Sequence, residues 1–411
     1  MSEEEKELVK VREGSAEIYV YLVDKDSIPS KSMNVFYNNT MEINRDISNL
    51  AIISYKKLYN PYELNIIDAM AASGISSIRM LMECENIKKI YINDINPIAI
   101  DLIYKNLELN PLNQDSIEIQ ISNKDANLLF LEVAQQKEIN SNVVEGRPNV
   151  ISIDPFGTPN KYIDSAFKTI AKTKGLLCIT ATDTAVLFGI KPAACVRKYM
   201  SKPLHTEYCK EIGARILLYF ISRIANVNRL GILPLLTFYS NHFIRIFILT
   251  FKNKKKITES FSKYGFIIHC KNCGFRSAIS IDPQKMIQLC PFCEENGKIE
   301  YAGPLWIGNI HDKLFVEDIL LQNNYKNYRN KKRIFNLINL ILDEIGMPLS
   351  YYNIHKLSQE LKISNIPKIE KVLNIIKEKG FRASRTHFDF VSIKTDLNIK
   401  ALKSSLLNMN D

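Results

Sequence analysis

Four cysteines in the second half of the chain have the spacing of a metal site. They are Cys270, Cys273, Cys290 and Cys293, which form the pattern C-x2-C-x16-C-x2-C. Each pair places two thiolates on one tight turn, and two such turns supply the tetrahedral set of sulfur ligands that Zn²⁺ favours. Two disulfides are the alternative, but they require an oxidising compartment. Because the pattern leaves no ligand position open, it predicts a structural zinc site.

A second group, DPFGTP at 154–159, combines a carboxylate, a backbone carbonyl and an aromatic ring directly after an apolar segment. Its prolines and its glycine indicate a rigid turn. Asp154 and the carbonyl of Pro155 can accept hydrogen bonds from the exocyclic amine of a base and hold it in line with a methyl donor. Phe156 can stack on that base once it is flipped out. The alternative is a turn that only terminates a strand.

The carboxylate at Asp154 favours one base over another. A carboxylate only accepts hydrogen bonds, and guanine presents two adjacent donors, N1–H and N2–H. The corresponding edge of adenine presents a donor beside an acceptor. Asp154 therefore favours guanine, although it does not decide between the two bases.

Three further predicted strands have an aspartate at their end or a few residues after it. The first reaches Asp68 and continues through small residues to Gly74, so the backbone can approach a ligand there. The second ends in Asp94, about 20 residues after Gly74, where an acid can accept from two ribose hydroxyls. Asp125, with Ala126 beside it, can accept from an adenine amine. The first loop lacks the phosphate-binding pattern G-x-x-x-x-G-K-[ST], so these residues indicate an adenosine-containing cofactor, and S-adenosylmethionine fits best.

These candidate residues lie at the ends of a regular series of apolar segments. Helix-length segments separate the first five, which predicts a parallel, doubly wound α/β sheet. Only Tyr239–His242 separates the last two, which predicts an antiparallel hairpin after a long helix near Leu204–Asn226. This Rossmann-like arrangement, with one antiparallel strand, is that of class I methyltransferases, whereas a dinucleotide dehydrogenase is parallel throughout. The predicted strands are Leu64–Ala69, Lys89–Asp94, Ile117–Ile121, Val150–Asp154, Leu176–Thr180, Gly231–Phe238 and Phe243–Thr250.

The sequence predicts four parts in the chain. They are an N-terminal extension to the cofactor site, the methyltransferase domain, a zinc-ribbon segment and a basic C-terminal domain, at 1–63, 64–256, 257–300 and 301–411. The extension contains one predicted strand, Ala16–Val23. In the last part, three predicted helices precede a hairpin within Phe381–Ile393, which is a winged-helix order. A helical packing or dimerisation domain is the alternative. The three helices are predicted at Ile334–Ile345, Tyr352–Leu361 and Pro367–Lys379.

The charge of the chain is distributed unevenly over its 411 residues. Residues 1–250 hold 28 Lys or Arg against 28 Asp or Glu, whereas residues 251–411 hold 26 against 16 and carry the net charge of +10. The functional interpretation is a neutral part that does chemistry joined to a basic part that binds a polyanion, most commonly nucleic acid. A compositional bias toward Lys, Asn and Ile is the alternative.

The sequence shows no sign of a membrane or a secretory destination. No segment approaches the ~18–20 consecutive apolar residues that a membrane span requires. The first residues, MSEEEKELVKVREG, are acidic and polar, unlike a secretory signal. We therefore expect a cytoplasmic protein, with no membrane and no obligate protein partner.

Seven stretches of the sequence carry a family resemblance. They are NVFYNNTMEINRD at 34–46, IIDAMAASGI at 66–75, NDINP at 93–97, KDAN at 124–127, DPFGTP at 154–159, TATDTAVLFG at 180–189 and PAACVRKYMSKPLHTEYCKEIGARILL at 192–218. They resemble the tRNA guanine-26 N2-dimethyltransferases over most of residues 13–250. DPFGTP and TEYCKEIGARILL are the most specific of them, and the zinc segment is consistent with the same family.

The resemblance implies roles for residues of the base and cofactor sites. Asp154 resembles the residue that binds the guanine amine, and Phe156 resembles its stacking partner. Phe36 and Arg45 resemble the N-terminal cofactor contacts of the family. Arg45 is then expected to pair with the methionine carboxylate of the cofactor.

The resemblance also covers the adenosine contacts, with one departure. Asp94 resembles the ribose ligand, and Asp125 with Ala126 resembles the adenine contacts. The family often has an arginine after the Gly-Ile of the first loop, where this chain has Ser76. Either Arg79, one helical turn further on, takes over part of that work, or the cofactor is held by fewer charges.

The resemblance implies methylation of the N2 amine of a guanine in tRNA, at position 26, with S-adenosylmethionine as methyl donor and zinc as a structural ion. Two classes of alternative remain open at this point. One is a methyltransferase that acts on another guanine or adenine amine in RNA or DNA. The other is a nucleic-acid-binding protein without enzymatic activity, either a winged-helix and zinc-ribbon regulator or an RNA chaperone.

Overall fold

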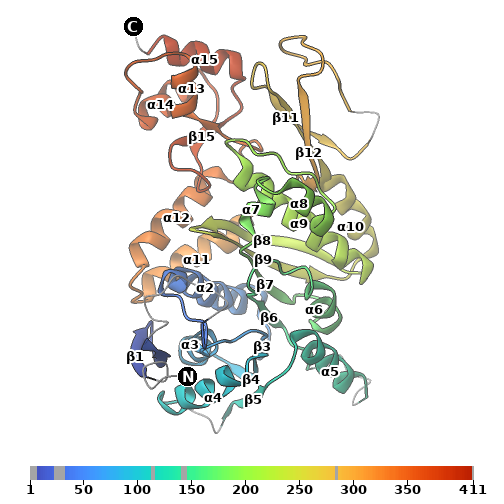
Figure 1. The fold of residues 1–411 in the computed structure, drawn as a ribbon, viewed down its shortest axis with the longest axis vertical. Helices are drawn as coiled ribbons and strands as arrows, with labels where there is room; N and C mark the ends of the chain where they lie inside the picture. Colours follow the sequence, from blue (N-terminus) through green and yellow to red (C-terminus); the bar gives the residue numbers. More distant parts are fainter. Residues whose placement is uncertain (1–6, 23–32, 113–115, 140–145, 283–285, 410–411) are drawn as a thin grey trace.

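A seven-stranded sheet forms the centre of the protein (Figure 1). It is described here in a computed structural model, which places residues 7–22, 33–112, 116–139, 146–282 and 286–409. The first six residues of the acidic N-terminal stretch, and Val23 of the predicted N-terminal strand, lie outside these ranges. The strands of the sheet are β3 (Leu64–Asp68), β4 (Ile87–Asn93), β5 (Glu118–Ser122), β6 (Val150–Ile153), β7 (Leu176–Ala181), β8 (Gly231–Ser240) and β9 (Phe243–Phe251).

The order of these strands in the sheet is β5-β4-β3-β6-β7-β9-β8. Neighbours from β5 to β7 run parallel, and β9 runs antiparallel to both β7 and β8. The seven predicted strands and the terminal hairpin with one antiparallel strand are therefore confirmed. The chain builds outward from β3 to β5 and then crosses back to β6. A crevice for a ligand is expected where the order reverses, at the carboxyl ends of β3 and β6.

Helices cover both faces of the sheet. One face carries α2 (Glu42–Tyr59), α3 (Ile75–Glu83) and α4 (Pro97–Glu108), and the other carries α5 (Ala126–Ile139), α6 (Ile163–Thr169) and α9 (Cys209–Val227). Ile66 and Ile67, consecutive on β3, show why: each packs into a different one of the two hydrophobic clusters. The short helices α7 (Thr184–Leu187) and α8 (Pro192–Tyr199) precede α9, which is the predicted long helix. Among the described residues, no helix is long and apolar enough to cross a membrane.

The N-terminal extension is a hairpin that rests on α4. Its strands are β1 (Leu8–Glu13) and β2 (Ala16–Tyr21), and a short 3-10 helix, η2 (Asn39–Met41), leads into α2. Asn106 of α4 accepts a hydrogen bond from the backbone N–H of Tyr19 at 2.6 Å and donates one to its carbonyl at 3.1 Å. A side-chain amide therefore satisfies the free edge of β2 in the way that a neighbouring strand would.

A small antiparallel sheet follows the methyltransferase sheet. Its order is β11-β10-β12, with β10 (Tyr264–Cys270), β11 (Arg276–Ser280) and β12 (Ile299–Trp306), and it comes after α10 (Lys254–Glu259) and η4 (Ser260–Lys263). Strand β12 packs against α9, and its Trp306 is fully buried. The zinc segment is thus attached to the central fold through an apolar contact.

The C-terminal part has the predicted winged-helix order. From α12 to β15 the chain forms helix, strand, two helices and two strands, and β13 joins the last two strands in the order β13-β15-β14. Tyr352 and Asn353 pair with β15, so the predicted helix at Tyr352–Leu361 begins two residues later. The elements are α11 (Lys313–Tyr325), α12 (Lys331–Glu344), β13 (Tyr352–Asn353), α13 (Ile354–Glu360), α14 (Ile369–Glu378), β14 (Ala383–Arg385), β15 (Ser392–Thr395) and α15 (Ile399–Leu407). The sequence analysis did not identify α11 or α15.

Residues 301–411 contain two packing units. Helix α11 lies against α2, and apolar residues of α11 and α12, such as Phe315 and Ile338, belong to the cluster that covers the central sheet. A separate hydrophobic cluster begins at Tyr352 and includes Val372 and Leu402. The two clusters separate between α12 and β13, and the predicted start of the C-terminal part at residue 301 stays a prediction.

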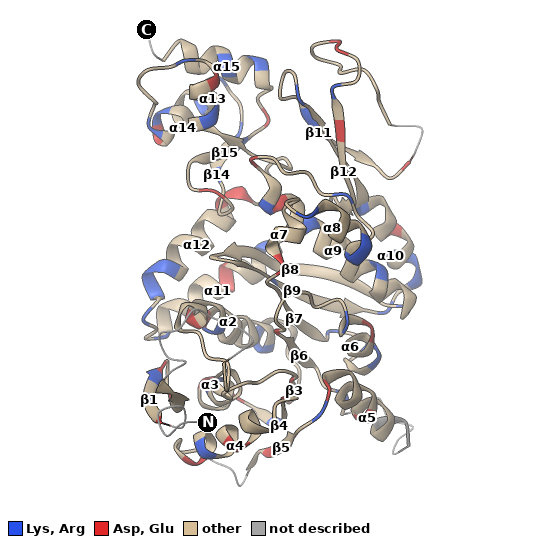
Figure 2. Cartoon of the chain, viewed as in Figure 1, with Lys and Arg blue, Asp and Glu red and all other residues tan. Residues whose placement is uncertain are grey.

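One basic residue of the C-terminal half pairs with a buried acid of the central fold. Figure 2 shows Lys and Arg on α10 and α12 and on the helices after β13. Between α11 and α12, however, Tyr328 is buried and donates to Glu83 at 2.6 Å, and Asn330 donates to Asp46 at 3.0 Å. Arg329 pairs with Glu42 of α2. This connection anchors the C-terminal half to α2 and α3.

The winged-helix part, meaning the chain from β13 onward, meets the central fold at a buried polar junction. Glu344, at the end of α12, accepts a hydrogen bond from Thr386 at 2.6 Å and contacts His387, and His311 lies 3.7 Å away. Burial lowers the pKa of His311 to about 4. Burial opposes the ionisation of Glu344, but the two histidines and Lys394 hold its pKa well below the usual range. Both groups therefore resist protonation in the folded state.

We expect this junction to make the fold sensitive to acid. The ordinary pKa of histidine is about 6.5, so as the pH falls from 6.5 toward 4 the unfolded chain binds a proton that folded His311 does not bind. The contribution of neutral His311 to the free energy of unfolding is fully present above this window. As the pH falls through the window, the free energy of unfolding decreases by roughly 2–3 kcal/mol. The lowered pKa of Glu344 adds a loss of the same sign below its ordinary value. Calorimetric unfolding temperatures between pH 7 and 4.5 should fall less steeply for H311Q than for the unmodified chain; parallel curves would contradict the assignment.

Candidate active site

Three carboxylates gather at the carboxyl ends of β3, β4 and β6. Asp68 ends β3, and Asp94 and Asp154 directly follow β4 and β6. Burial raises the pKa of Asp68 to about 6, a hydrogen bond from Ser77 at 2.7 Å opposes this shift, and the charges of Asp154 and Asp94 add to it. The strand register agrees, because Asp68 pairs with Ile92 of β4 and with Ser152 of β6, each two residues before one of the other carboxylates. The sheet therefore brings together three of the predicted site residues.

Asp94 fastens the loop that follows β3. One of its oxygens accepts from the backbone N–H of Ala72 at 2.8 Å, and the other accepts from that of Asn96 at 2.9 Å. Ala72 and Gly74 have positive φ angles of 49° and 80°, so the loop needs small residues. Ile95, next to Asp94, exposes 69% of its surface. A half-buried carboxylate beside an exposed aliphatic side chain suits a ribose and the adenine that it carries.

The same loop contains the features that test its fit to S-adenosylmethionine. The hydroxyl of Ser73 is buried and has no hydrogen-bond partner among the described residues, and Ser76 is half-buried in the first turn of α3. A Cβ atom on Gly74 would come within 3.1 Å of Ile103. Small residues and a free hydroxyl, without a basic side chain for phosphates, fit an adenosine that carries an amino acid. Ser76 as a cofactor ligand stays a prediction.

Asp125 and Ala126 lie where β5 leads into α5. Asp125 is exposed, and its carboxylate accepts from the backbone N–H of Asn127 at 2.8 Å. Ala126 is buried, and Asn93 at the end of β4 donates to the carbonyl of Lys124 at 2.9 Å. These bonds hold the loop beside Asp94, at the edge where the cofactor site was predicted. The adenine contacts themselves stay predictions.

The two predicted cofactor arginines are bound to carboxylates of the protein. Arg45 pairs with both oxygens of Glu13 at 2.6 Å. Arg79 pairs with Glu13 at 2.9 Å, Asp46 at 2.7 Å and Glu83 at 2.9 Å, and it has no exposed surface. Of the two alternatives from the sequence, this geometry favours a cofactor held by fewer charges over a role for Arg79. A contact between Arg45 and the cofactor also stays a prediction.

The turn after β6 is rigid and presents an aromatic ring. Gly157 has a φ angle of 88°, its N–H donates to the hydroxyl of Thr182 at 2.7 Å, and its carbonyl accepts from the N–H of Thr182 at 2.9 Å. Asp154 is half-buried and Phe156 is 46% exposed. The ring of Phe36 meets that of Phe156 edge-on at 4.6 Å. Phe36, predicted at the cofactor, therefore lies against the predicted base-stacking residue.

Asn44, which the sequence did not mark as a candidate, lies beside Asp154. It lies in the first turn of α2 and is buried, and its Nδ2 donates to Oδ2 of Asp154 at 3.3 Å. The sequence feature that could have identified it is its place in the stretch at 34–46, directly before Arg45 and Asp46. Nothing in the sequence alone indicates that this stretch lies beside Asp154.

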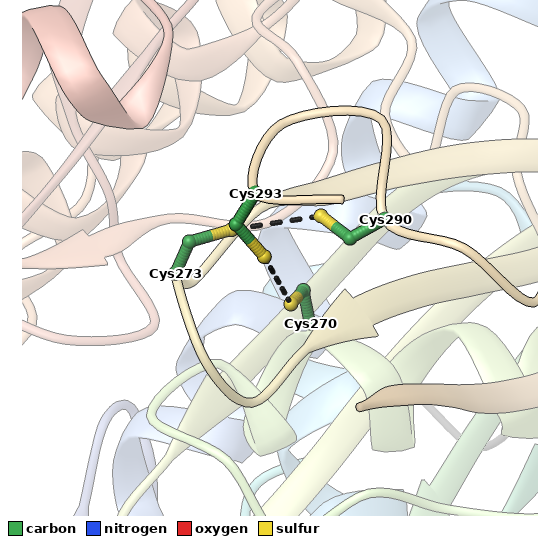
Figure 3. A group of neighbouring side chains, drawn as sticks. All are labelled: Cys270, Cys273, Cys290 and Cys293. Atoms are coloured by element: carbon green, nitrogen blue, oxygen red, sulfur yellow. Dashed lines mark hydrogen bonds between the residues drawn. The ribbon is translucent and has the colours of Figure 1, made fainter. Parts of the chain in front are cut away.

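The four predicted zinc ligands converge (Figure 3). All four sulfur atoms lie within 4.8 Å of one another, with Cys270 and Cys293 3.7 Å apart and Cys273 and Cys290 3.6 Å apart. Disulfide sulfurs would be ~2 Å apart, whereas Zn–S bonds of ~2.3 Å in a tetrahedron separate the sulfurs by about 3.8 Å. These cysteines therefore fit a closed, structural Zn²⁺ site.

The zinc segment also touches the winged-helix part. Arg276 of β11 pairs with Glu207 at 2.9 Å and donates to the carbonyl of Tyr351 at 2.7 Å. Its guanidinium lies over the rings of Tyr208 and Tyr352, at 4.6 and 4.2 Å from their centroids. The segment thus connects the residues before α9 with the start of the C-terminal unit.

The strand order, the acidic strand ends and the small-residue loop define a class I methyltransferase. Comparisons with known proteins agree. Residues 14–406 match the sequence model of the family described as N2,N2-dimethylguanosine tRNA methyltransferase. The tRNA (guanine(26)-N(2))-dimethyltransferase of Methanosphaera stadtmanae is 36% identical over 98% of this chain and 97% of its own length. The chain belongs to the N2,N2-dimethylguanosine tRNA methyltransferase family.

Two further relatives extend the comparison. The tRNA (guanine(26)-N(2)/guanine(27)-N(2))-dimethyltransferase of Aquifex aeolicus is 32% identical over 96% of this chain and 95% of its own length. The solved structure of Trm1 from Pyrococcus horikoshii with S-adenosyl-L-methionine is 30% identical, covers 97% of this chain and 100% of its own, and has a TM-score of 0.80. The fold described above is therefore that of the family along nearly the whole chain.

We expect one zinc ion per chain and a dependence of the C-terminal half on it. In C273S one of the four sulfur ligands is lost, so the metal content measured by mass spectrometry should fall and the unfolding temperature should drop by several degrees, because metal binding is linked to folding. C209S, which changes a cysteine outside the cluster, serves as the matched control. Equal zinc content in both variants would contradict the assignment of the ligands.

Proposed function

We propose that this chain methylates the exocyclic N2 amine of a guanine in tRNA, at position 26, to N2-methylguanosine and then N2,N2-dimethylguanosine, with S-adenosylmethionine as donor. The family and the names of its relatives support the substrate class. One observation in this chain carries the chemistry: the carboxylate of Asp154 and the exposed ring of Phe156 lie on a rigid turn at the same sheet edge as Asp94. The same proposal places the reaction in the cytoplasm, with tRNA as partner.

On the cofactor side, the residues after β3, β4 and β5 would bind the adenosine. Asp94 accepts hydrogen bonds from the ribose hydroxyls with the lone pairs that Ala72 and Asn96 leave free. Ile95 supplies an apolar surface for the adenine ring, and Asp125 accepts from the adenine amine. When bound, S-adenosylmethionine supplies a methyl group on a positively charged sulfur, which makes that carbon electrophilic.

On the base side, the turn after β6 would hold the flipped-out guanine. Phe156 stacks on the ring, supported edge-on by Phe36, and Asp154 with the carbonyl of Pro155 accepts the N–H groups of the guanine edge. The N2 amine is a poor nucleophile because its lone pair is delocalised into the ring. Acceptors that favour positive charge on N2 and hold it in line with the methyl lower that barrier.

The cofactor, the guanine and Asp154 account for every bond and proton in the methyl transfer. A bond forms between N2 and the methyl carbon, and the bond between that carbon and sulfur breaks, which leaves S-adenosylhomocysteine. The amine loses one proton, and the carboxylate of Asp154 stands in position to receive it. A second methyl donor can repeat the step, because N2-methylguanosine still has one N–H group.

Nucleoside analysis after incubation of the full chain with an unmodified tRNA transcript and labelled S-adenosylmethionine tests the proposal. We expect label in N2-methylguanosine and N2,N2-dimethylguanosine at position 26. A transcript with adenine at position 26 separates that position from guanine 27, which the name of the Aquifex aeolicus relative also includes. Labelled adenosine would favour the adenine alternative, and binding of tRNA without transfer would favour a protein without enzymatic activity.

We expect D154N to abolish transfer and to leave the cofactor site in place. The substitution keeps the shape of the side chain but turns an N–H donor toward the N–H groups of guanine, so kcat should fall at least 100-fold. Calorimetric titration should give a Kd for S-adenosylmethionine within about threefold of the unmodified chain. D101N, on the exposed face of α4, is the matched control and should keep full activity. Turnover by D154N at the control rate would remove Asp154 from this role.

The complementary change is D94A, which should weaken cofactor binding. Loss of hydrogen bonds to a charged group costs about 1.5–3 kcal/mol, so Kd for S-adenosylmethionine should rise roughly 10- to 100-fold. Because Asp94 also holds the backbone of Ala72, the unfolding temperature is measured in parallel. An unchanged Kd in a folded variant would show that the ribose binds elsewhere.

A further inference from the structure

The amide of Asn44 has a fixed orientation at the proposed base site. Its side chain is 2% exposed and contacts Oδ2 of Asp154 at 3.3 Å. An ionised carboxylate can only accept hydrogen bonds, so the NH₂ group of Asn44 must face Asp154. Its Oδ1 then points to a place where, among the described residues, it has no hydrogen-bond partner although it is buried. A buried acceptor of this kind requires an explanation, and a ligand is one.

The backbone around Asn44 is held on several sides. The next residue, Arg45, is bound to Glu13, and Asp46 is bound to Arg79 at 2.7 Å. The hydroxyl of Ser48, one helical turn further on, donates to the carbonyl of Asn44 at 2.6 Å. These bonds fix the first turn of α2, so the Asn44 amide is preorganised against Asp154.

The same face of α2 continues the wall of the site. Ser48 accepts a hydrogen bond from the buried guanidinium of Arg245 at 3.0 Å, and Arg245 also donates to Thr180 at 2.7 Å. Nη2 of Arg245 also lies 3.5 Å from the hydroxyl of Ser152, the residue of β6 that pairs with Asp68, and its charge opposes the raised pKa of Asp68. Asn44 and Ser48, at i and i+4 of α2, are thus bound to Asp154 and to Arg245, respectively.

We infer that Asn44 is a positioning residue for methyl transfer, and this inference rests on the proposed function. Its Nδ2 holds one oxygen of Asp154, which leaves the other oxygen to face an N–H of guanine. Its own Oδ1 accepts an N–H from a bound ligand. Two groups of the bound ligands could donate this hydrogen bond to Oδ1 of Asn44. They are the guanine amine and the ammonium of the methionine part of the cofactor.

The decisive variant is N44D. It places a second carboxylate against Asp154, and two carboxylates that share a site raise the pKa of one of them. The acid limb of the pH profile of kcat should therefore move up by at least one pH unit, whereas a merely structural defect would lower kcat equally at every pH. The charged groups around the neighbouring Asp68, which include Asp94 and Arg245, are unchanged in this variant.

A second variant, N44A, measures the contact itself. Its kcat should fall 10- to 100-fold, because Asp154 is no longer oriented and the ligand loses one acceptor. An unchanged Kd for S-adenosylmethionine in calorimetry would assign the Oδ1 contact to guanine, and a Kd raised in step would assign it to the ammonium group. Q135E and Q135A, at an exposed position of α5, make the same amide-to-carboxylate and amide-to-methyl changes away from the site; they are the matched controls and should behave as the unmodified chain.

The outcomes separate this inference from the proposed function. If the unmodified chain labels guanine N2 and both Asn44 variants, folded and able to bind S-adenosylmethionine, keep its kcat and its pH profile, the role of Asn44 is overturned and the function stands. If the unmodified chain leaves guanine N2 unlabelled in every tRNA, the proposed function fails, and this inference fails with it.

Discussion

A buried network of five charged side chains holds the active-site half of the molecule together. Two arginines, Arg45 and Arg79, bind three carboxylates from β1, α2 and α3, those of Glu13, Asp46 and Glu83. Burying such charges is costly unless each one is paired. The cost is visible at Asp46, whose pKa is raised to about 6 because burial outweighs the nearby arginine. The network fixes the N-terminal hairpin against the sheet and sets the direction from which α2 enters the site.

Much of the architecture could be predicted because its signals are local. The alternation of apolar and helix-length segments determines a parallel sheet, and a parallel sheet brings the ends of its strands to one edge. Asp68, Asp94 and Asp154 were therefore recognisable as a group, although they are separated by 26 and 60 residues in the chain. The spacing of the cysteines, from Cys270 to Cys293, is likewise a local pattern whose geometry follows from the metal.

The remaining features depend on contacts between distant segments. The ion pairs of Arg45 and Arg79 with Glu13 could not be predicted, because Glu13 lies 32 and 66 residues away and nothing in its surroundings marks it as an internal acid. The place of Asn44 was hidden for the same reason, since its partner is 110 residues further on. The contact of α11 with α2 could not be predicted either, because no local pattern encodes it.

The connection between α11 and α12, which anchors the C-terminal half to α2 and α3, is synthesised late. Tyr328 and Asn330 complete the surroundings of Glu83 and Asp46, two acids that are made much earlier on the ribosome. Until that late segment emerges, Glu83 and Asp46 have only the donors that come earlier in the chain, such as Arg79 and Asn49. A product that ends before Tyr328 would therefore keep the arginine network but leave Glu83 and Asp46 each short of one hydrogen-bond donor.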